Sequence, residues 1–270
     1  MKHSSFYKGE FSINSMLKLE KKGQLTLFII LAILIVGGIA VFFLVSNSSI
    51  ISAPNSKFPE INSFIENCIK ETTMEAIYFN SLQGGYYKTL PKMYSFIPLE
   101  YFKVPVYFKE GKANIPKLEM IEAELSKYVS ENFVSCINLL NNSFSEKGIV
   151  ILPGKLKSVQ TSILPDEVLV RVDYPITVSS NEFSVNLRNF EGRADFDFEK
   201  IMGDISSFIE IQKTNPKFIL FTQMEDFSEE NGLEIESFKM GNTSDYVHNF
   251  IYPLIKYNNR TYIFSFGVSY

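Results

Sequence analysis

The feature that most constrains this chain is a long apolar run near its beginning. Residues 25–45 read LTLFIILAILIVGGIAVFFLV, which is 21 residues without a charged side chain. A helix of this length spans roughly 30 Å, the thickness of the hydrocarbon core of a bilayer. A buried core helix is the alternative, but the length of the run and its flanking charges favour a transmembrane helix.

The charges on the two sides of this run differ. Residues 1–24 contain five lysines and two glutamates, a net charge of +3, and no basic residue follows the run before Lys57. Positively charged flanks stay in the cytoplasm, so residues 1–24 are predicted to form a cytoplasmic leader. The whole chain carries −4; subtracting the +3 of the leader leaves −7 for the rest, which is expected outside the cytoplasm. The sequence therefore predicts a single-pass protein that contacts membrane lipid.

The junction before the apolar run reads KKGQLTL over residues 21–27. It resembles the class III signal peptide of archaeal prepilins, in which a basic pair and a glycine precede a glutamine and an apolar helix. The resemblance implies a prepilin peptidase as a partner and cleavage between Gly23 and Gln24. An uncleaved signal anchor is the alternative. Phe28 stands where many members have a glutamate, which counts against regular pilus assembly.

Three segments beyond the membrane run also carry a resemblance: FIENCI at 64–69, LQGGYY at 82–87 and the pair Cys136-Ile137. Together they resemble uncharacterised membrane-anchored proteins of small-genome archaea. This second resemblance implies an archaeal source and a surface location, and it implies no activity.

The remaining chain is predicted to contain a tether and one domain. Residues 46–59 are polar, include two prolines and form the tether. Residues 60–270 form an extracytoplasmic α+β domain, with two helices followed by a mostly antiparallel β-sheet into which one helix is inserted. Apolar side chains at helical spacing predict helices over residues 60–82, 117–144 and 198–213.

Strands are predicted where the apolar period changes to two. These segments are 157–164, 167–173, 182–190 and 233–240, and a closing hairpin pairs 246–257 with 261–270. Residues 258–260, Asn-Asn-Arg, form its turn, because asparagine tolerates positive φ. Four prolines cut residues 86–116 into short extended pieces.

Cys68 and Cys136 are the only two cysteines, and both fall on predicted apolar helix faces. In an oxidising exterior they could pair and join the first two helices of the domain. Such a bond closes a loop of about 69 residues and would stabilise the fold by roughly 4 kcal/mol. Two separately buried thiols are the alternative.

Four Asn-x-Ser/Thr sequons lie beyond the membrane run, and all four are predicted to occupy loops or turns. They are Asn47, Asn141, Asn242 and Asn259. Exposed loops are where glycans can be attached, so these four residues are candidate glycosylation sites.

The composition argues against several kinds of chemistry. An acidic net charge disfavours nucleic-acid binding, two histidines are too few for a multi-histidine metal centre, and two cysteines cannot hold a four-cysteine zinc site or an iron–sulfur cluster. GxSxG, HExxH and Walker A sequences are absent from the chain. We therefore expect a protein that is not an enzyme, with no cofactor and no metal site.

Two features remain as candidates for chemistry. His248 stands alone in a strand-like stretch, where a structural role is expected, and a hydrolase built around it is the weakest alternative. The acidic run at residues 195–199 could bind Ca²⁺. Capping of the helix that starts near Phe198 by Asp195 or Asp197 explains the run better. A second acidic run at 225–232 is predicted to be a solvated loop.

Aromatic residues crowd the proline-rich segment, where they could form either an exposed recognition patch or core, and core is favoured. They are Tyr86, Tyr87, Tyr94, Tyr101, Phe102, Tyr107 and Phe108. The sequence as a whole predicts a surface protein with a structural, adhesive or assembly role, pilin-like in its sharper form, whose partners are envelope or filament proteins. The alternative is an extracytoplasmic ligand-binding or sensor module, which a pocket lined by these aromatics would favour.

Overall fold

The structure is a computed structural model and describes residues 58–88 and 95–270. The predicted leader, the transmembrane run and most of the tether lie outside the described residues, and so do Gly23, Gln24 and Asn47. Within the described ranges, no helix is both long enough and apolar enough to cross a bilayer.

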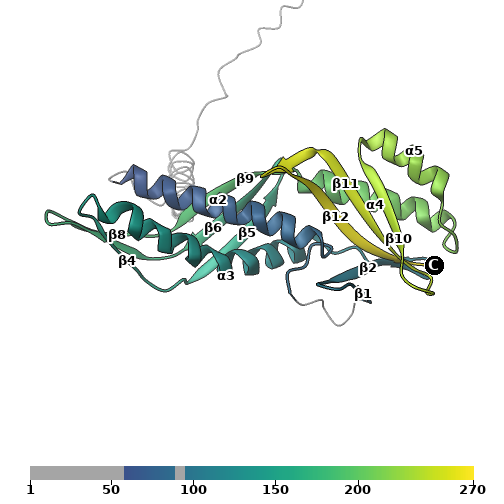
Figure 1. The fold of residues 1–270 in the computed structure, drawn as a ribbon, viewed down its shortest axis with the longest axis horizontal. Coiled ribbons are helices and arrows are strands. Elements are labelled where there is room, and N and C mark those ends of the chain that lie inside the picture. The colour runs from purple at the N-terminus through teal and green to yellow at the C-terminus, as the bar shows by residue number, and fades with distance from the viewer. Residues whose placement is uncertain (1–57, 89–94) are drawn as a thin grey trace, which may run out of the picture. The chain divides into compact units, whose positions relative to one another are not determined.

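The described chain has an α+β fold with mostly antiparallel sheets (Figure 1). Its helices are α2 (Pro59–Ser81), α3 (Leu118–Ser145), α4 (Phe198–Thr214) and α5 (Phe221–Asn231). Its strands are β1 (Phe96–Pro98), β2 (Lys103–Lys109), β3 (Lys112–Ala113), β4 (Val150–Pro153), β5 (Ser158–Leu164), β6 (Glu167–Asp173), β7 (Ile176–Ser179), β8 (Ser184–Leu187), β9 (Phe190–Asp195), β10 (Glu234–Lys239), β11 (Asp245–Tyr257) and β12 (Arg260–Ser269).

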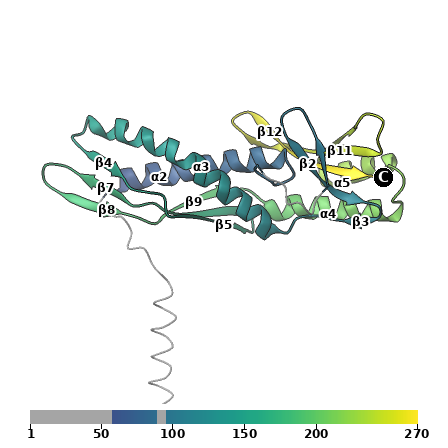
Figure 2. The ribbon, with the colours of Figure 1, turned by 90° about the horizontal axis from the view of Figure 1, so that it is seen from below.

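Helices α2 and α3 form an antiparallel pair. Proline occupies the first position of α2, where its missing N–H costs no helical hydrogen bond. The helix ends before Gly84 and Gly85, which both take positive φ. At the other end of the pair, Lys147 Nζ lies 2.7 Å from Glu60 Oε2. Figure 1 shows the two helices next to each other, and Figure 2 shows α3 crossing α2 at an angle.

The strands form three sheets. The largest has the order β1-β2-β12-β11-β10, with β3 added to β2, and the other two have the orders β4-β7-β8 and β5-β6-β9. All pairings are antiparallel except that of β12 with β2. The parallel pair brings the end of the chain back to the segment that follows α2.

The α2–α3 pair and helix α4 cover different sheets. Helix α2 packs on β9, and α3 packs on β5 and β4. Helix α4 covers the sheet of the β11–β12 hairpin, where the ring centroid of Phe208 lies 5.2 Å from that of Phe250 and 6.0 Å from that of Phe266. The apolar side chains from both regions form one continuous core.

Most of the predicted elements are confirmed. Helices α2, α3 and α4, strands β5, β6 and β10, and the closing hairpin lie within a residue or two of their predicted bounds. The proline-rich segment contains the strands β1, β2 and β3, as expected, but Pro105 does not interrupt the chain there, because β2 runs through it.

Three predictions about the fold were wrong. The acidic run at 225–232 is not a loop: it belongs to α5, which buries Met224 and Phe227 and ends at Gly232 with a φ of 64°. The expected strand over 182–190 is two strands, β8 and β9, because the chain turns at Asn189, where φ is 59°. The strands form three sheets rather than the single expected one, since β7 pairs with β4 and β8, and β6 pairs with β5 and β9, apart from the hairpin.

Candidate functional site

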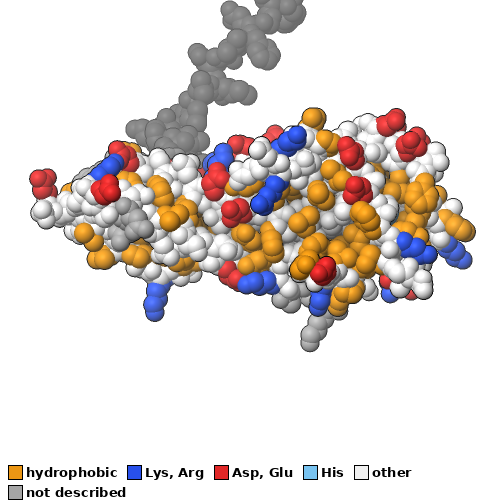
Figure 3. All heavy atoms as spheres, in the orientation of Figure 1, with side chains coloured by type: hydrophobic (Ala, Val, Ile, Leu, Met, Phe, Trp, Pro, Cys, Tyr) orange, Lys and Arg blue, Asp and Glu red, His pale blue; other side chains and the backbone are white. Residues whose placement is uncertain are grey.

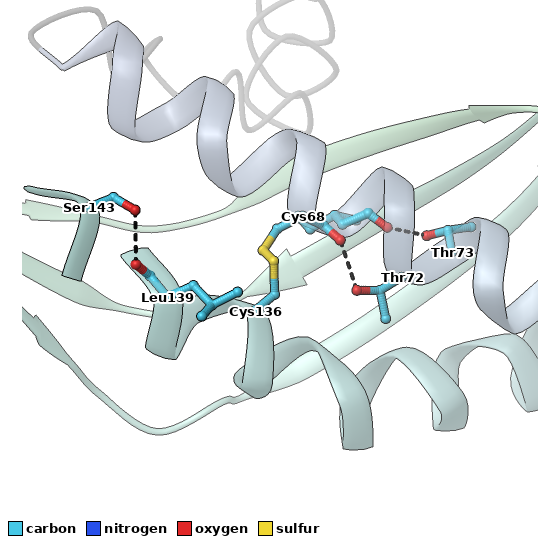
Figure 4. Close-up of a disulfide and its surroundings, with 7 residues drawn as sticks. Cys68, Thr72, Thr73, Cys136, Leu139 and Ser143 are labelled. Atoms are coloured by element: carbon cyan, nitrogen blue, oxygen red, sulfur yellow. Dashed lines mark hydrogen bonds between the residues drawn. A yellow bond between two sulfur atoms is a disulfide. The ribbon is translucent and has the colours of Figure 1, made fainter. Parts of the chain in front are cut away.

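The predicted disulfide is confirmed: Cys68 of α2 is bonded to Cys136 of α3 (Figure 4). Their Cα atoms lie 6.0 Å apart, within the usual range for a disulfide. Thr72 and Thr73 donate hydrogen bonds from their hydroxyls to the carbonyls of Cys68 and Ile69, one helical turn earlier. The bond therefore joins the two long helices near the middle of α2.

A stripe on the second half of α2 forms one side of the candidate site. The stripe consists of Glu75, Tyr78, Phe79 and Leu82. The last three lie three, four and seven residues after Glu75, so all four lie along one face of the helix. The core of α2 uses other positions, including Ala76 and Ile77, which are fully buried. The stripe is only partly buried, and Phe79 is 46% exposed.

The turn of the β11–β12 hairpin forms the opposite side. Asn258 and Asn259 have φ values of 49° and 61°, the positive values that a tight two-residue hairpin turn requires. The turn places Tyr257 and Arg260 opposite each other as the last pair of the ladder. The hydroxyl of Tyr257 donates a hydrogen bond to Glu71, which fixes the hairpin against α2.

Between these parts lies a cavity of about 660 Å³. We call it the hairpin cavity, and it is lined by Glu75, Tyr78, Phe79, Leu82, Tyr128, Tyr257, Arg260, Thr261 and Ile263. Its volume is in the range of small-molecule sites, about 300–1,000 Å³. Figure 3 shows hydrophobic side chains gathered where the end of α2 meets β12 and β2.

The aromatic side chains of the hairpin cavity form two groups. In the first, the Tyr78 centroid lies 5.6 Å from that of Tyr257. In the second, the Phe79 and Tyr128 centroids are 5.6 Å apart, and Tyr87 packs behind both at 5.9 Å and 5.0 Å. These contacts hold each ring against a neighbour, so the aromatic surfaces are in place before any ligand arrives.

The phenol groups of the cavity remain protonated near neutral pH. Burial raises the pKa of Tyr78. Burial also raises the pKa of Tyr128, with a further contribution from the negative charge of Glu75. The pKa of Tyr257 is raised by burial and then by its hydrogen bond to Glu71. Each hydroxyl therefore stays neutral; that of Tyr257 already donates to Glu71, and that of Tyr78 is buried.

Two opposite charges of the cavity are unpaired within the part of the chain that the structure describes. The carboxylate of Glu75 and the guanidinium of Arg260 make no ion pair with any described residue. No described residue hydrogen-bonds to either side chain. The α2 side of the cavity thus offers the hydrogen-bond acceptors of Glu75, and the hairpin side offers the hydrogen-bond donors of Arg260. Aromatic side chains line most of the rest of the cavity.

The acidic run at 195–199 caps α4, as expected. Asp197 Oδ1 accepts a hydrogen bond from the N–H of Lys200 at 2.8 Å, and Asp195 pairs with Lys70 at 3.1 Å. In residues 58–88 and 95–270, no cluster of three or more histidine, cysteine or acidic side chains could hold a metal ion.

His248 is enclosed in the core beneath α4. It is fully buried between Phe208 and Phe266, and its Nδ1 lies 2.7 Å from the Ser237 hydroxyl. Burial lowers the pKa of His248 to about 3, so the ring is neutral. The residue lies in the core and does not line the hairpin cavity.

The described sequons occupy different settings. Asn242 lies in the exposed turn between β10 and β11, and Asn259 lies in the exposed hairpin turn beside the hairpin cavity. Asn141 was predicted to lie in a loop, and that placement was wrong, because its backbone belongs to α3. Helix α3 continues past it to Ser145, since Leu140 and Phe144 keep the apolar face buried.

The aromatics of residues 86–108 do not form the cavity wall. Tyr86, Tyr107 and Phe108 are buried in the core, whereas Tyr101 is exposed, and Tyr94 lies outside the described residues. Sequence reasoning therefore missed the site. The sequence signal that could have revealed it is the stripe on α2, because its aromatic side chains lie at positions other than the fully buried ones of that helix.

Comparisons with family models, with curated proteins and with solved structures find no match to the chain.

Proposed function

We propose that the chain is a membrane-anchored binding protein whose folded domain lies outside the cytoplasm and takes its ligand in the hairpin cavity. The anchor is the apolar run of residues 25–45, and the role is recognition without catalysis. The observation that carries the proposal is the cavity itself, with preformed aromatic surfaces and two unpaired opposite charges.

The disulfide supports an extracytoplasmic location. Disulfides persist in oxidising compartments and are rare in the cytosol. Cys68 and Cys136 are paired in the domain, and the charge asymmetry around residues 25–45 predicts an exterior position for this part of the chain.

The character of the cavity supports binding. Small-molecule sites combine apolar and aromatic walls with a few polar groups that orient the ligand. The hairpin cavity has this composition, with Glu75 and Arg260 as its charged groups. It lies on the domain surface, between elements that the Tyr257–Glu71 hydrogen bond holds together.

A retention experiment tests this function. The full chain in detergent is incubated with small molecules extracted from its native cells and medium, washed, and analysed by mass spectrometry. We expect a molecule that the native chain retains and the double variant Glu75→Leu/Arg260→Leu does not. The control Glu229→Leu/Lys239→Leu removes the same two charges from exposed sites outside the cavity and should retain it. Identical retention by native chain and cavity variant, or none by either, would overturn the proposal.

A second candidate is assembly with copies of itself or with envelope proteins, in the manner of a pilin-like subunit. The observation that favours it is a set of exposed apolar side chains on α3 and the edge strand β4: Leu139, Val150 and Leu152. Exposed apolar side chains on an edge strand are typical of association surfaces.

The processed, pilin-like form makes a direct prediction. N-terminal sequencing of protein from native membranes should find Gln24 first, and sheared cell fractions should contain filaments. An intact Met1 on surface-extracted protein would contradict processing and leave a plain signal anchor.

A further inference from the structure

The hairpin cavity restricts the chemistry of its ligand through its charges. The Glu75 carboxylate only accepts hydrogen bonds, and the Arg260 guanidinium only donates them. A second carboxylate, Glu71, stands one turn from Glu75 on α2 and is held by Tyr257. An anionic ligand would be attracted by Arg260 but repelled by the two glutamates, and a cationic ligand would be attracted by the glutamates but repelled by Arg260. A ligand of one charge sign therefore cannot pair with both sides of the cavity.

The best ligand therefore has neutral groups that both donate and accept hydrogen bonds. Hydroxyl groups do both, so one molecule with several hydroxyls can satisfy Glu75, Arg260 and the Thr261 hydroxyl together. A neutral ligand also avoids the free-energy cost of removing a charge from water, which a zwitterion would incur twice.

The aromatic surfaces add a requirement of shape. Rings of Tyr78 and Tyr257 form one group, and rings of Phe79 and Tyr128 form the other. Flat aromatic faces gain most from a ligand that presents a flat apolar surface of its own. A saccharide ring has this form, because its C–H groups lie on the faces and its hydroxyls project from the edge.

We propose that the hairpin cavity binds a neutral saccharide, with a sugar ring packed against the aromatic side chains and its hydroxyls paired with Glu75 and Arg260. This inference rests on the proposed binding function and names its ligand class. The phenol of Tyr128, which stays protonated, supplies a further donor at the edge of the ring.

The absence of tryptophan from the chain gives a sensitive test. Phe79→Trp places a single tryptophan in the cavity wall, and the control Phe221→Trp places one at a position that is 66% exposed on α5. The full chain is prepared in a detergent without a sugar headgroup. It is then titrated with neutral oligosaccharides of glucose, galactose, mannose and N-acetylglucosamine, with uronic acid oligomers, and with glycine betaine.

We expect a saturable change in the Phe79→Trp emission with at least one neutral oligosaccharide and no change in the Phe221→Trp emission. Adding Glu75→Leu or Arg260→Leu should weaken the binding about tenfold, whereas Glu229→Leu should leave it unchanged. Thermal unfolding of each variant checks that it is folded.

Other outcomes would overturn the saccharide. These are saturation by betaine or by uronic acid oligomers alone, no response to any neutral oligosaccharide, or equal responses from both tryptophan variants. The retention experiment separates this failure from that of the proposed function, because a retained molecule that is not a saccharide overturns only the ligand class.

Discussion

Glu122 of α3 accepts a hydrogen bond at its Oε1 atom from the backbone N–H of Ile163, at 2.7 Å. One turn along the helix, the Ser126 hydroxyl accepts from the N–H of Thr161 at 3.0 Å. Four residues of helix and two residues of strand both cover about 6–7 Å, so the two periods match. Strand β5 is the edge of its sheet, and α3 supplies the acceptors that a neighbouring strand would otherwise provide.

Removing the first of these acceptors should destabilise the domain. We expect Glu122→Ala to lower the free energy of unfolding by about 1–3 kcal/mol, because the buried N–H of Ile163 loses its partner. Glu122→Gln keeps an oxygen at the same place and should cost less. Chemical denaturation of both variants measures the difference, and an equal loss in the two would show that the hydrogen bond is not the cause.

The close approach of α2 to β9 makes Gly192 a position for glycine alone. A Cβ there would lie 2.5 Å from the Cγ2 atom of Ile69 and 3.1 Å from the carbonyl oxygen of Glu66. We expect Gly192→Ala to destabilise the domain by about 1–3 kcal/mol, because helix and strand must separate.

Gly203 provides the matched control. It lies within α4, where an added Cβ would meet no heavy atom within 4 Å. Gly203→Ala should stabilise the domain by up to about 1 kcal/mol, because alanine favours the helix. The two variants should therefore shift the midpoint of thermal unfolding in opposite directions, and a shift in the same direction would contradict the packing described for Gly192.

The burial of His248 predicts a stability that depends on pH. In the unfolded chain the pKa of a histidine is near 6.5, whereas burial lowers the pKa of His248 to about 3 in the folded domain. Between these values the unfolded chain binds a proton that the folded domain does not bind. The contribution of this residue is therefore complete above about pH 6.5 and is lost as the pH falls toward 3.

The variant His248→Gln should lack this dependence. Between pH 7 and pH 4.5 we expect the native chain to lose about 2–3 kcal/mol more than the variant, from a slope of about 1.4 kcal/mol per pH unit. Denaturant unfolding at the two pH values measures both losses. Parallel losses in the two proteins would mean that His248 takes up a proton without unfolding.

The sequence predicted the elements that carry many apolar side chains at regular spacing. Helix α3 shows this pattern over its whole length, whereas α5 has only Met224 and Phe227 on its buried face, among acidic residues that suggested a loop. The disulfide was predictable because the chain has two cysteines and both lie on apolar helix faces.

The hairpin cavity could not be predicted in the same way. It requires the turn after Tyr257 to meet the end of α2, and the Tyr257–Glu71 contact joins residues 186 positions apart. No local pattern encodes such a contact. The arrangement of the sheets also depends on long-range pairing. The clearest example is the parallel pair of β12 with β2, which joins the strands that follow α2 to the closing hairpin.

The redox state of Cys68 and Cys136 in protein from its native membrane tests the extracytoplasmic domain most directly. The protein is alkylated under denaturing conditions before and after reduction, and the modified peptides are identified by mass spectrometry. We predict that neither cysteine is alkylated before reduction and that both are alkylated after it, because the two sulfurs are bonded to each other. Alkylation of both cysteines without reduction would contradict a domain that folds in an oxidising exterior.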